Sequence, residues 1–245
     1  MAERPRFFIP AADFGGERIS LSGEPLHHLH SVLRLKTGAE LLLLDGRGNC
    51  CLGRLDSVDR RAAAVTVLER WQENERCCPL QLLQALPKGD KFDLVLQKGT
   101  ELGISRFQPL LSARTVSRPE RGRLERWQRI VSEAARQSRR PCLPSVAELL
   151  PLAEALAGVT APLRLLLWEA GSRPLVEVLP AGAPEEVAVL VGPEGGLTGE
   201  EVALAGAAGF VPVHLGPRIL RTETAGLALA AVMQFRYGDW GAAPG

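Results

Sequence analysis

The sequence predicts an α/β protein in which a small β-rich unit precedes a larger unit of alternating strands and helices. Short apolar runs separated by turn residues occupy the first 72 residues, and from residue 79 apolar strands alternate with helix-length amphipathic segments. Two valine-rich runs, residues 187–191 and 211–215, are typical of parallel strands covered on both faces. Such alternation indicates an open sheet flanked by helices.

Composition narrows the class of protein further. Of 245 residues, 46% are hydrophobic and 23% are charged, which is ordinary for a soluble globular protein. No apolar run reaches the roughly 20 residues needed to span a bilayer, and the N-terminus lacks a secretion-signal pattern. The five cysteines include two adjacent pairs and no C-x-x-C spacing. We therefore expect a reduced, cytoplasmic protein without a structural metal or a membrane contact.

The first unit is predicted to be a compact barrel of short strands. Its expected strands are residues 7–9, 18–21, 39–44, 50–55 and 63–68, with one short helix at 25–34. Asp45-Gly46 and Gly48-Asn49 supply turn conformations for a hairpin over residues 42–52. The polar, unpatterned residues 72–76 indicate a boundary, which divides the chain into residues 1–73 and 74–245.

The second unit is predicted as alternating strands and helices. Expected strands are residues 80–86, 104–111, 163–168, 187–191 and 211–215, and expected helices are residues 90–102 and 119–139. Thr198 and Glu201 form a capping box that opens another helix. The last helix, residues 225–235, is apolar almost all round, which indicates burial on every side. A second copy of the chain would cover the face that the sheet leaves free, and burial within one chain is the alternative.

Charge is distributed unevenly, although the net charge is only +1. Residues 73–149 hold 14 Lys and Arg against 9 Asp and Glu, and residues 118–140 contain eight arginines and three glutamates. Arginine forks match phosphate oxygens, so this stretch predicts a polyanionic partner. A solvated helix face is the alternative. His27, His28 and His30 have no acidic or cysteine partner at metal-ligand spacing, and His214 reads as a hydrogen-bonded core residue.

A glycine-rich loop, residues 192–198 (GPEGGLT), follows the apolar run 187–191. Its only charged side chain is Glu194, whereas a phosphate-binding P-loop carries a lysine, and a carboxylate would repel phosphates. A neutral or cationic ligand fits better, and S-adenosylmethionine combines a phosphate-free adenosine with a positively charged sulfonium. Glycines allow the backbone to approach such a ligand closely. A plain turn between strand and helix is the alternative.

A second loop with Gly and Pro at a strand exit, residues 216–225 (GPRILRTETA), strengthens the prediction of a pocket. Ligands in open α/β sheets bind beyond the carboxyl ends of the strands, so the two loops would form two sides of one site. The polar residues of the two loops are Glu194, Arg218, Arg221, Thr222, Glu223 and Thr224. Because unpaired charges are costly to bury, this set indicates function rather than packing.

These motifs resemble the bacterial 16S ribosomal RNA (uracil-N3) methyltransferases of the SPOUT superfamily. The resemblance rests on residues 192–196 (GPEGG) and 215–225 (LGPRILRTETA), and extends to residues 28–34, 44–48, 86–91, 96–103 and 133–138. It covers nearly the whole chain. The sequence departs from the family at Arg139, where a glycine is usual, and at Gly99, where an alanine is common.

The resemblance implies a PUA-like β-barrel that binds RNA, followed by an α/β domain with a deep C-terminal trefoil knot. It implies S-adenosylmethionine as the cofactor, 16S rRNA as the substrate, and a homodimer formed through the knot and the C-terminal helix. The implied cofactor-binding residues are Leu167, Val191, Gly192, Gly195, Gly196, Leu215, Gly216, Ile219, Leu220 and Thr224. We expect RNA contacts from Arg34, Lys36, Lys88, Lys98, Arg114, Arg136, Arg139 and Arg140.

The implied reaction transfers a methyl group to uracil N3, which carries a proton and is a poor nucleophile until it loses it. Catalysis then needs positioning and stabilisation of the developing uracil anion. Arg221 or Arg218 would stabilise the anion, and Glu194 or Glu223 would accept the proton or orient an arginine. One alternative is a knotted ribose 2′-O-methyltransferase, although those relatives carry serine and asparagine where this chain has residues 221–224 (RTET). The other is a non-catalytic RNA-binding or assembly factor.

Overall fold

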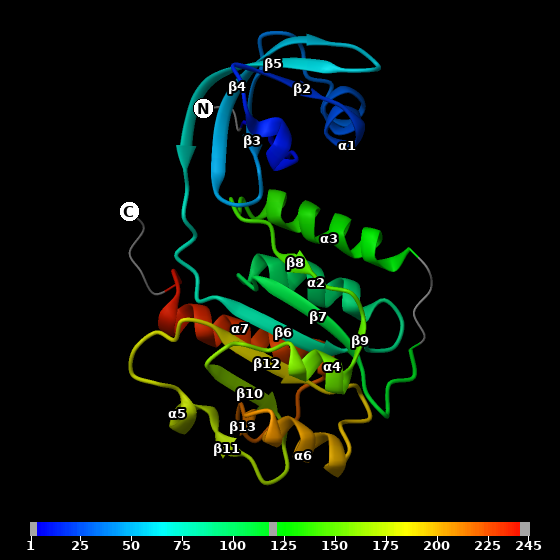
Figure 1. The fold of residues 1–245 in the computed structure, drawn as a ribbon, viewed down its shortest axis with the longest axis vertical. Helices are drawn as coiled ribbons and strands as arrows, with labels where there is room; N and C mark the ends of the chain where they lie inside the picture. Colours follow the sequence, from blue (N-terminus) through cyan, green and yellow to red (C-terminus); the bar gives the residue numbers. More distant parts are fainter. Residues whose placement is uncertain (1–3, 118–121, 241–245) are drawn as a thin grey trace. The chain divides into compact units, whose positions relative to one another are not determined.

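The computed structural model describes residues 4–117 and 122–240, which form two compact units (Figure 1). The first unit contains the described residues up to Glu75 together with Ala135–Leu143. The second contains Arg76–Ala134, apart from residues 118–121, and the chain from Pro144 onward. The chain therefore passes from the first unit to the second, returns over residues 135–143, and leaves again.

The first unit is built on a five-stranded sheet in the order β1-β3-β4-β5-β2. The β1–β3 pair is parallel and the other pairs are antiparallel. Its strands are β1 (Arg6–Phe8), β2 (Arg18–Leu21), β3 (Glu40–Leu44), β4 (Asn49–Val58) and β5 (Ala63–Gln72). Its helical segments are η1 (Ala11–Phe14), α1 (Gly23–His27) and the π-helical turn η2 (His28–Val32). All five predicted strands are present, and α1 with η2 replaces the single helix that was expected.

The predicted hairpin is confirmed, because β3 and β4 pair in antiparallel register. The Asp45 carboxylate accepts hydrogen bonds from the backbone N–H groups of Arg47 (2.7 Å) and Asn49 (3.1 Å). Gly48 has a φ of 94°, and a Cβ there would lie 2.6 Å from the Glu73 carbonyl oxygen. Only glycine fits that position without a shift of the backbone.

Residues 135–143 are tied to the rest of the first unit by side-chain hydrogen bonds. The Arg140 guanidinium donates two, of 2.8 and 2.7 Å, to the Glu75 carboxylate; Arg140 is buried and Glu75 is half-buried. Arg6 donates to the Arg139 carbonyl oxygen at 2.8 Å. Arg139 itself has a φ of 62°, the left-handed region that costs a non-glycine residue about 1–2 kcal/mol. This left-handed backbone conformation explains why the similar family usually has a glycine at this position.

The larger unit contains an eight-stranded sheet whose main order is β11-β13-β10-β12-β6-β7-β8, with β9 paired to β7. Every strand pair is parallel, as the valine-rich runs predicted. The strands are β6 (Leu80–Ala85), β7 (Arg106–Leu111), β8 (Ser145–Val146), β9 (Leu150–Pro151), β10 (Leu163–Leu167), β11 (Arg173–Pro174), β12 (Val187–Val191) and β13 (Val211–His214). All residues of the central strands β6 and β12 are buried.

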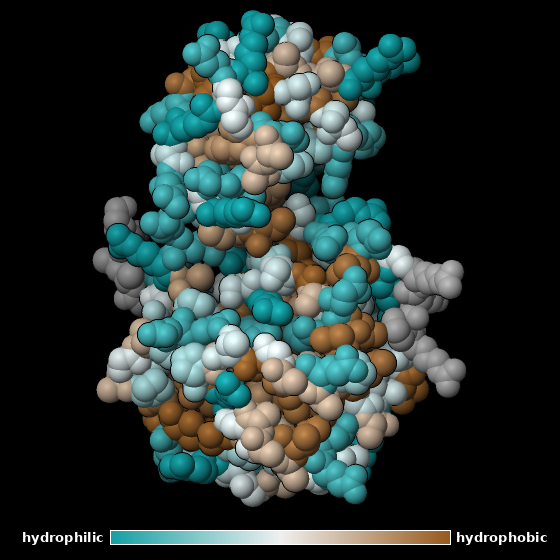
Figure 2. Space-filling view, viewed as in Figure 1, coloured by the Kyte–Doolittle hydropathy of each residue, from teal (hydrophilic) through white to brown (hydrophobic). Residues whose placement is uncertain are grey.

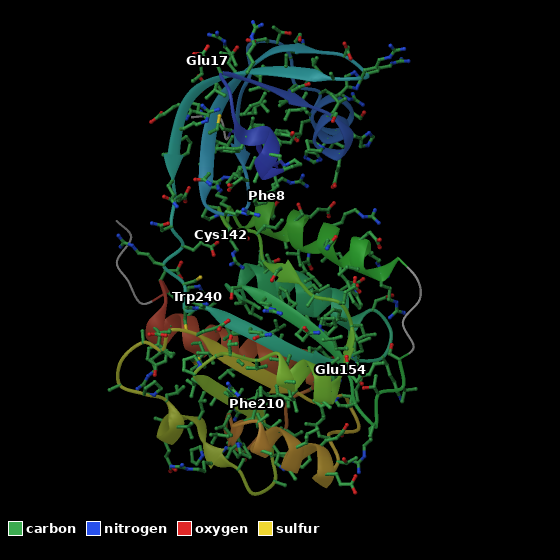
Figure 3. All side chains as sticks on the ribbon, viewed as in Figure 1. Phe8, Glu17, Cys142, Glu154, Phe210 and Trp240 are labelled. Carbon is green, nitrogen blue, oxygen red and sulfur yellow. The ribbon has the colours of Figure 1, made fainter. Side chains whose placement is uncertain are left out.

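Helices cover both faces of this sheet (Figure 1). They pack against it through two clusters of apolar side chains. One cluster joins the sheet to α2 (Lys91–Glu101), α3 (Arg123–Gln137), α5 (Leu175–Val178) and α7 (Thr222–Tyr237). The other joins it to α4 (Leu152–Ala157) and α6 (Gly199–Ala207), and includes Phe210, which Figure 3 labels. Burial of these apolar side chains is the main force that holds the layers together.

Most of the predicted elements of the larger unit are present, and the capping box of α6 is complete. The N-terminal part of the predicted helix 119–139 falls on residues 118–121, outside the described residues, and α3 begins at Arg123. The short elements β8, β9, α4, β11 and α5 were not predicted, because two to six residues carry too little periodicity. No helix among the described residues is long and apolar enough to cross a membrane. Figure 2 shows patches of hydrophobic side chains within the polar surface of the larger unit.

Gly99 of α2 is a second departure from the similar family that the packing explains. A Cβ at this position would lie 2.7 Å from Phe107 Cε1 and 2.8 Å from Ile104 Cδ1. We expect Gly99→Ala to lower the free energy of unfolding by about 1–3 kcal/mol through overpacking, despite a helix-propensity gain of about 1 kcal/mol.

Urea denaturation followed by circular dichroism measures this effect. Gly206→Ala in α6 is the matched control, because nothing lies within 4 Å of a Cβ there. That variant is expected to gain about 0.5–1 kcal/mol. If both alanine variants were stabilised equally, the packing argument for Gly99 would be wrong.

Candidate active site

A cavity of about 820 Å³ opens at the carboxyl ends of the central strands of the larger unit. Its volume lies within the range of about 300–1,000 Å³ typical of small-molecule sites, and its position is the usual one in open α/β sheets. Segments that follow β10, β12 and β13 line it, together with Lys91 and the first turn of α7. Four of its charged lining residues are Lys91, Glu194, Arg218 and Glu223.

The two Gly-Pro loops do not follow neighbouring strands, because β10 lies between β12 and β13 in the sheet. Leu167, at the end of β10, therefore occupies the floor between the loops, and Trp168 and Glu169 continue from it. The Trp168 backbone N–H donates to the Val213 carbonyl at 3.1 Å. Three strand ends thus contribute to one cavity, where the sequence pattern indicated two.

The glycine loop, residues 192–198, is a tight turn held by neighbouring backbone. The Gly196 N–H donates to the Pro193 carbonyl at 2.8 Å, and Gly196 has a φ of 70°. The Thr198 side chain accepts from the Glu201 N–H, and the Glu201 carboxylate accepts from the Thr198 N–H at 2.8 Å. This capping box fixes the direction in which α6 leaves the loop.

The segment after β7 donates hydrogen bonds to the glycine loop and to the helix that follows it. Arg114 Nη1 donates to the Gly195 carbonyl at 2.8 Å and to the Leu197 carbonyl at 3.5 Å. The Ala113 N–H donates to the Glu201 carboxylate at 2.6 Å. Arg114 was predicted to contact RNA; its guanidinium donates to the glycine loop while the residue is exposed, and the RNA contact stays a prediction.

The first part of the second loop, residues 216–221, leads from β13 toward α7. The Gly216 N–H donates to His214 Nδ1 at 3.2 Å, so His214 is hydrogen-bonded as predicted, although it is half-buried and lines the cavity. Ile219 is 82% exposed. The hydroxyl of Thr222 donates to the Gly192 carbonyl at 2.5 Å and accepts from Gln84 Nε2 at 2.9 Å. This chain of contacts joins β6, the glycine loop and α7.

The cations of the cavity are of two kinds. Arg218 and Arg221 are exposed, and their guanidinium groups make no hydrogen bond or ion pair with the described residues. Lys91, in contrast, lies between two carboxylates, with its Nζ 3.1 Å from Glu194 and 3.4 Å from Glu223. The hydrogen bond to Glu194 raises the pKa of Lys91, desolvation opposes this shift, and the contact with Glu223 adds to it, so that the pKa lies above its ordinary value. Lys91 is therefore a compensated cation, and the two arginines are available to a ligand.

The Glu194 carboxylate has two hydrogen-bond donors. It accepts from the Lys88 N–H at 3.0 Å as well as from Lys91. Partial burial alone would raise the pKa of Glu194, but these hydrogen bonds outweigh it and hold the pKa below its ordinary value. Glu194 thus ties the segment before α2 to the glycine loop.

The structure brings most of the predicted site residues together. All four predicted catalytic residues line the cavity: Glu194, Arg218, Arg221 and Glu223. Of the predicted cofactor-binding residues, Leu167, Val191, Gly192, Gly196, Leu215, Gly216, Ile219 and Leu220 line it. Gly195 and Thr224 are not among its lining residues. Sequence reasoning missed Lys91, near the start of the predicted helix 90–102, and Trp168 and Glu169, at the carboxyl end of the predicted strand 163–168.

The predicted RNA-contacting residues have diverse surroundings. Arg34, Lys36, Lys88 and Arg139 are exposed, Arg136 is half-buried, and Lys98 pairs with Glu101 at 2.8 Å. Arg140 is placed differently from the expectation, because its buried guanidinium is engaged with Glu75. Its position next to a surface arginine in the sequence gave no warning of this burial.

The five cysteines form no disulfide bond. In the described part of the chain, no group of three or more His, Cys, Asp or Glu is placed to hold a metal ion. Burial raises the pKa of Cys78 to about 11, so its thiol stays protonated near neutral pH.

Comparison with known families agrees with this geometry. The model of an RNA methyltransferase domain family matches residues 73–234, and that of an RNA methyltransferase PUA domain matches residues 21–68. Ribosomal RNA small subunit methyltransferase E of Synechocystis sp. is 41% identical over 213 residues, which are 84% of this chain and 69% of that protein. The Bacillus subtilis protein of the same name is 35% identical over 229 residues, 87% of this chain and 88% of that one.

Solved structures show the same architecture over nearly the whole chain. Ribosomal RNA small subunit methyltransferase E from Neisseria gonorrhoeae, bound to S-adenosylmethionine, has a TM-score of 0.89 and 35% identity, and the match covers 97% of this chain and 100% of that one. A methyltransferase from Legionella pneumophila in complex with the same cofactor has a TM-score of 0.87 and 29% identity, covering 95% and 98%. The predicted fold, a PUA domain followed by an α/β methyltransferase domain, is confirmed. The chain therefore belongs to the RNA methyltransferase family that includes the ribosomal RNA small subunit methyltransferases E.

Proposed function

We propose that this protein transfers a methyl group from S-adenosylmethionine to N3 of a uridine in the 16S rRNA of the small ribosomal subunit. The observation that carries the proposal is the cavity at the carboxyl edge of the sheet, lined by the glycine loop and by two unpaired arginines. Membership of the RNA methyltransferase family supports it. Because the proposed substrate is 16S rRNA, we propose a cytoplasmic location for the protein.

The residues of the cavity fit S-adenosylmethionine in size and charge. A volume of about 820 Å³ accommodates a molecule of this class. The charged residues that line the whole cavity sum to zero, but the cluster of Lys91, Glu194 and Glu223 carries a net charge of −1, which at that wall favours a sulfonium and disfavours a phosphate. The glycine loop and the second loop would hold the adenosine through backbone groups. When bound, the cofactor supplies an electrophilic methyl group on a positively charged sulfur.

Arg221 and Arg218 are suited to the substrate side of the reaction. Uracil N3 becomes nucleophilic when its proton leaves, and the resulting negative charge spreads to O2 and O4. A guanidinium facing either oxygen stabilises that charge. Because N3 lies on the pairing edge of the base, the target uridine must be unpaired or flipped out of a helix.

The test of the proposal uses ribosomal RNA from cells with and without the gene. An N3-methyl group blocks base pairing and stops reverse transcriptase, so one stop in 16S rRNA is expected to disappear on deletion and to return when the gene is restored. A stop that survived deletion would refute the assignment. A 2′-O-methyl product would favour the ribose alternative, and absence of S-adenosylmethionine binding in calorimetry would favour a non-catalytic RNA-binding factor.

We further propose that the protein forms a homodimer through α7 and the knot that the resemblance implies. The buried face of α7 includes Leu229 and Met233, whereas Val232 and Phe235 are 41% and 70% exposed. Trp240, which follows this helix and is labelled in Figure 3, is 51% exposed. A second copy of the chain would remove these apolar side chains from water.

Phe235→Glu is expected to weaken this dimer. Burying a phenylalanine contributes about 1.5–3 kcal/mol, so the dissociation constant should rise about 10- to 150-fold. Sedimentation velocity over a concentration series measures the change. Val176→Glu in α5, where the native valine is 69% exposed, is the matched control and should leave the dimer intact. Equal dissociation of both variants would place the interface elsewhere.

A further inference from the structure

Three charged side chains from three different elements meet at the wall of the cavity. Lys91 is the first residue of α2, Glu194 lies in the middle of the glycine loop, and Glu223 lies in the first turn of α7. The Lys91 ammonium contacts both carboxylates, at 3.1 and 3.4 Å. All three residues line the cavity, so the cluster is open to a ligand there.

The two carboxylates are not equivalent. Glu194 is satisfied by the Lys88 N–H and by Lys91, and its pKa lies below the ordinary value because these bonds outweigh partial burial. A carboxylate held in this way is a poor proton acceptor. Glu223 is buried, and its Oε2 forms an ion pair with Lys91 at 3.4 Å but makes no hydrogen bond within the described part of the chain. Buried polar atoms are nearly always hydrogen-bonded, so this oxygen has the capacity to accept a donor from a ligand.

Resting on the function proposed above, we propose that Lys91 is a positioning residue that holds the Glu223 carboxylate in place at the cavity wall, where this carboxylate accepts the N3 proton of the uracil. In this step the N3–H bond breaks and its proton passes to a Glu223 oxygen. The electron pair left on N3 attacks the methyl carbon, the sulfur–carbon bond breaks, and the sulfur keeps its pair. Lys91, Glu194 and Glu223 change together from a net charge of −1 to zero.

Lys91 is needed because a buried carboxylate without a counter-charge takes up a proton from water. Among the described residues, the charged group in contact with Glu223 is Lys91 from α2, which also pairs with Glu194, and Arg221 from the turn before α7 lines the same cavity. The strands β6 and β12, which pack against α7, contribute no charged side chain. Removal of the lysine would therefore leave the buried Glu223 carboxylate without its counter-charge, and activity would need a higher pH.

The experiment measures single-turnover methylation of small ribosomal subunits that lack the modification, from pH 5 to 9, with radiolabelled S-adenosylmethionine. Lys91→Met is expected to lower the rate near neutral pH about 10- to 100-fold and to move the acidic limb of the pH profile upward. Lys91→Arg, which keeps the charge, should recover most of the rate. Glu223→Gln should lose the rate at every pH. Rates are compared at saturating cofactor, calorimetry measures the change in cofactor affinity that the altered charge of the cluster brings, and thermal melting confirms that each variant folds.

Arg173→Met is the matched control, because this exposed cation pairs with Glu177 outside the cavity and should leave rate and profile unchanged. An unaltered rate and pH profile in Lys91→Met would overturn the proposal, as would a rate loss fully explained by weaker cofactor binding. A wild-type protein that forms no N3-methyluridine would instead overturn the proposed function, so the two failures are distinguishable.

Discussion

Replacing Arg221 with alanine is expected to slow methyl transfer to rRNA about 100- to 1,000-fold. Arg221 lines the cavity just before α7, and its guanidinium is not paired with any described residue. An unpaired cation next to the reacting base can face the negative charge that develops on uracil, and the loss of one such donor has this magnitude in other enzymes. The affinity for S-adenosylmethionine should change little, because the two loops are expected to hold the cofactor mainly through backbone groups.

Single-turnover rates at saturating cofactor, together with calorimetry of cofactor binding, measure this prediction. Arg221→Lys keeps the charge without the planar fork and should retain an intermediate rate. Arg218→Ala provides the comparison between the two arginines: a rise in KM for rRNA without a fall in kcat would assign Arg218 to a phosphate contact. Retention of the full rate in Arg221→Ala would remove Arg221 from the chemistry.

The second large effect concerns stability, at Gln234 of α7. This side chain is 1% exposed, and its Oε1 accepts from the Cys78 N–H at 2.8 Å. Its Nε2 donates to the carbonyl groups of Cys78 at 3.1 Å and Gly103 at 3.3 Å. One amide therefore satisfies three backbone groups, at the entrance to β6 and at the turn after α2.

Gln234→Leu keeps the size of the side chain and removes all three hydrogen bonds. Because each buried unsatisfied group costs about 1–3 kcal/mol, we expect the free energy of unfolding to fall by about 3–5 kcal/mol. Urea denaturation measures the loss. Gln97→Leu on the exposed face of α2 is the control and should change stability by less than about 0.5 kcal/mol. Comparable losses in both variants would mean that the buried network contributes nothing specific.

Local patterns predicted the elements that are long or strongly periodic. The valine-rich strands β12 and β13, the hairpin between β3 and β4, and the capping box of α6 all follow from a few neighbouring residues. The order of the strands does not, because it depends on pairing between distant segments. The insertion of β10 between β12 and β13 was therefore not foreseen. The knot is beyond such patterns for the same reason, and it stays a prediction from the resemblance.

The sequence predicted the two loops of the site, because glycines, prolines and charged residues mark loops at strand ends. Lys91 was missed because a lysine at the start of a helix is common in sequences, and its two carboxylate partners lie more than a hundred residues away. Arg140 was misplaced because an arginine run does not reveal which member turns inward toward Glu75. In both cases the deciding information is a long-range ion pair, which no local pattern contains.

The return of residues 135–143 to the first unit has a consequence for how this enzyme class can be rearranged. A gene fragment that stops at residue 75 would encode an N-terminal module without the Arg140 partner of Glu75 and without the carbonyl that Arg6 binds. A single crossover between relatives would therefore yield a chimera in which residues 1–75 and residues 135–143 come from different proteins, and their contacts would not match. Transfer of the complete unit requires the exchange of two segments, residues 1–75 and residues 135–143.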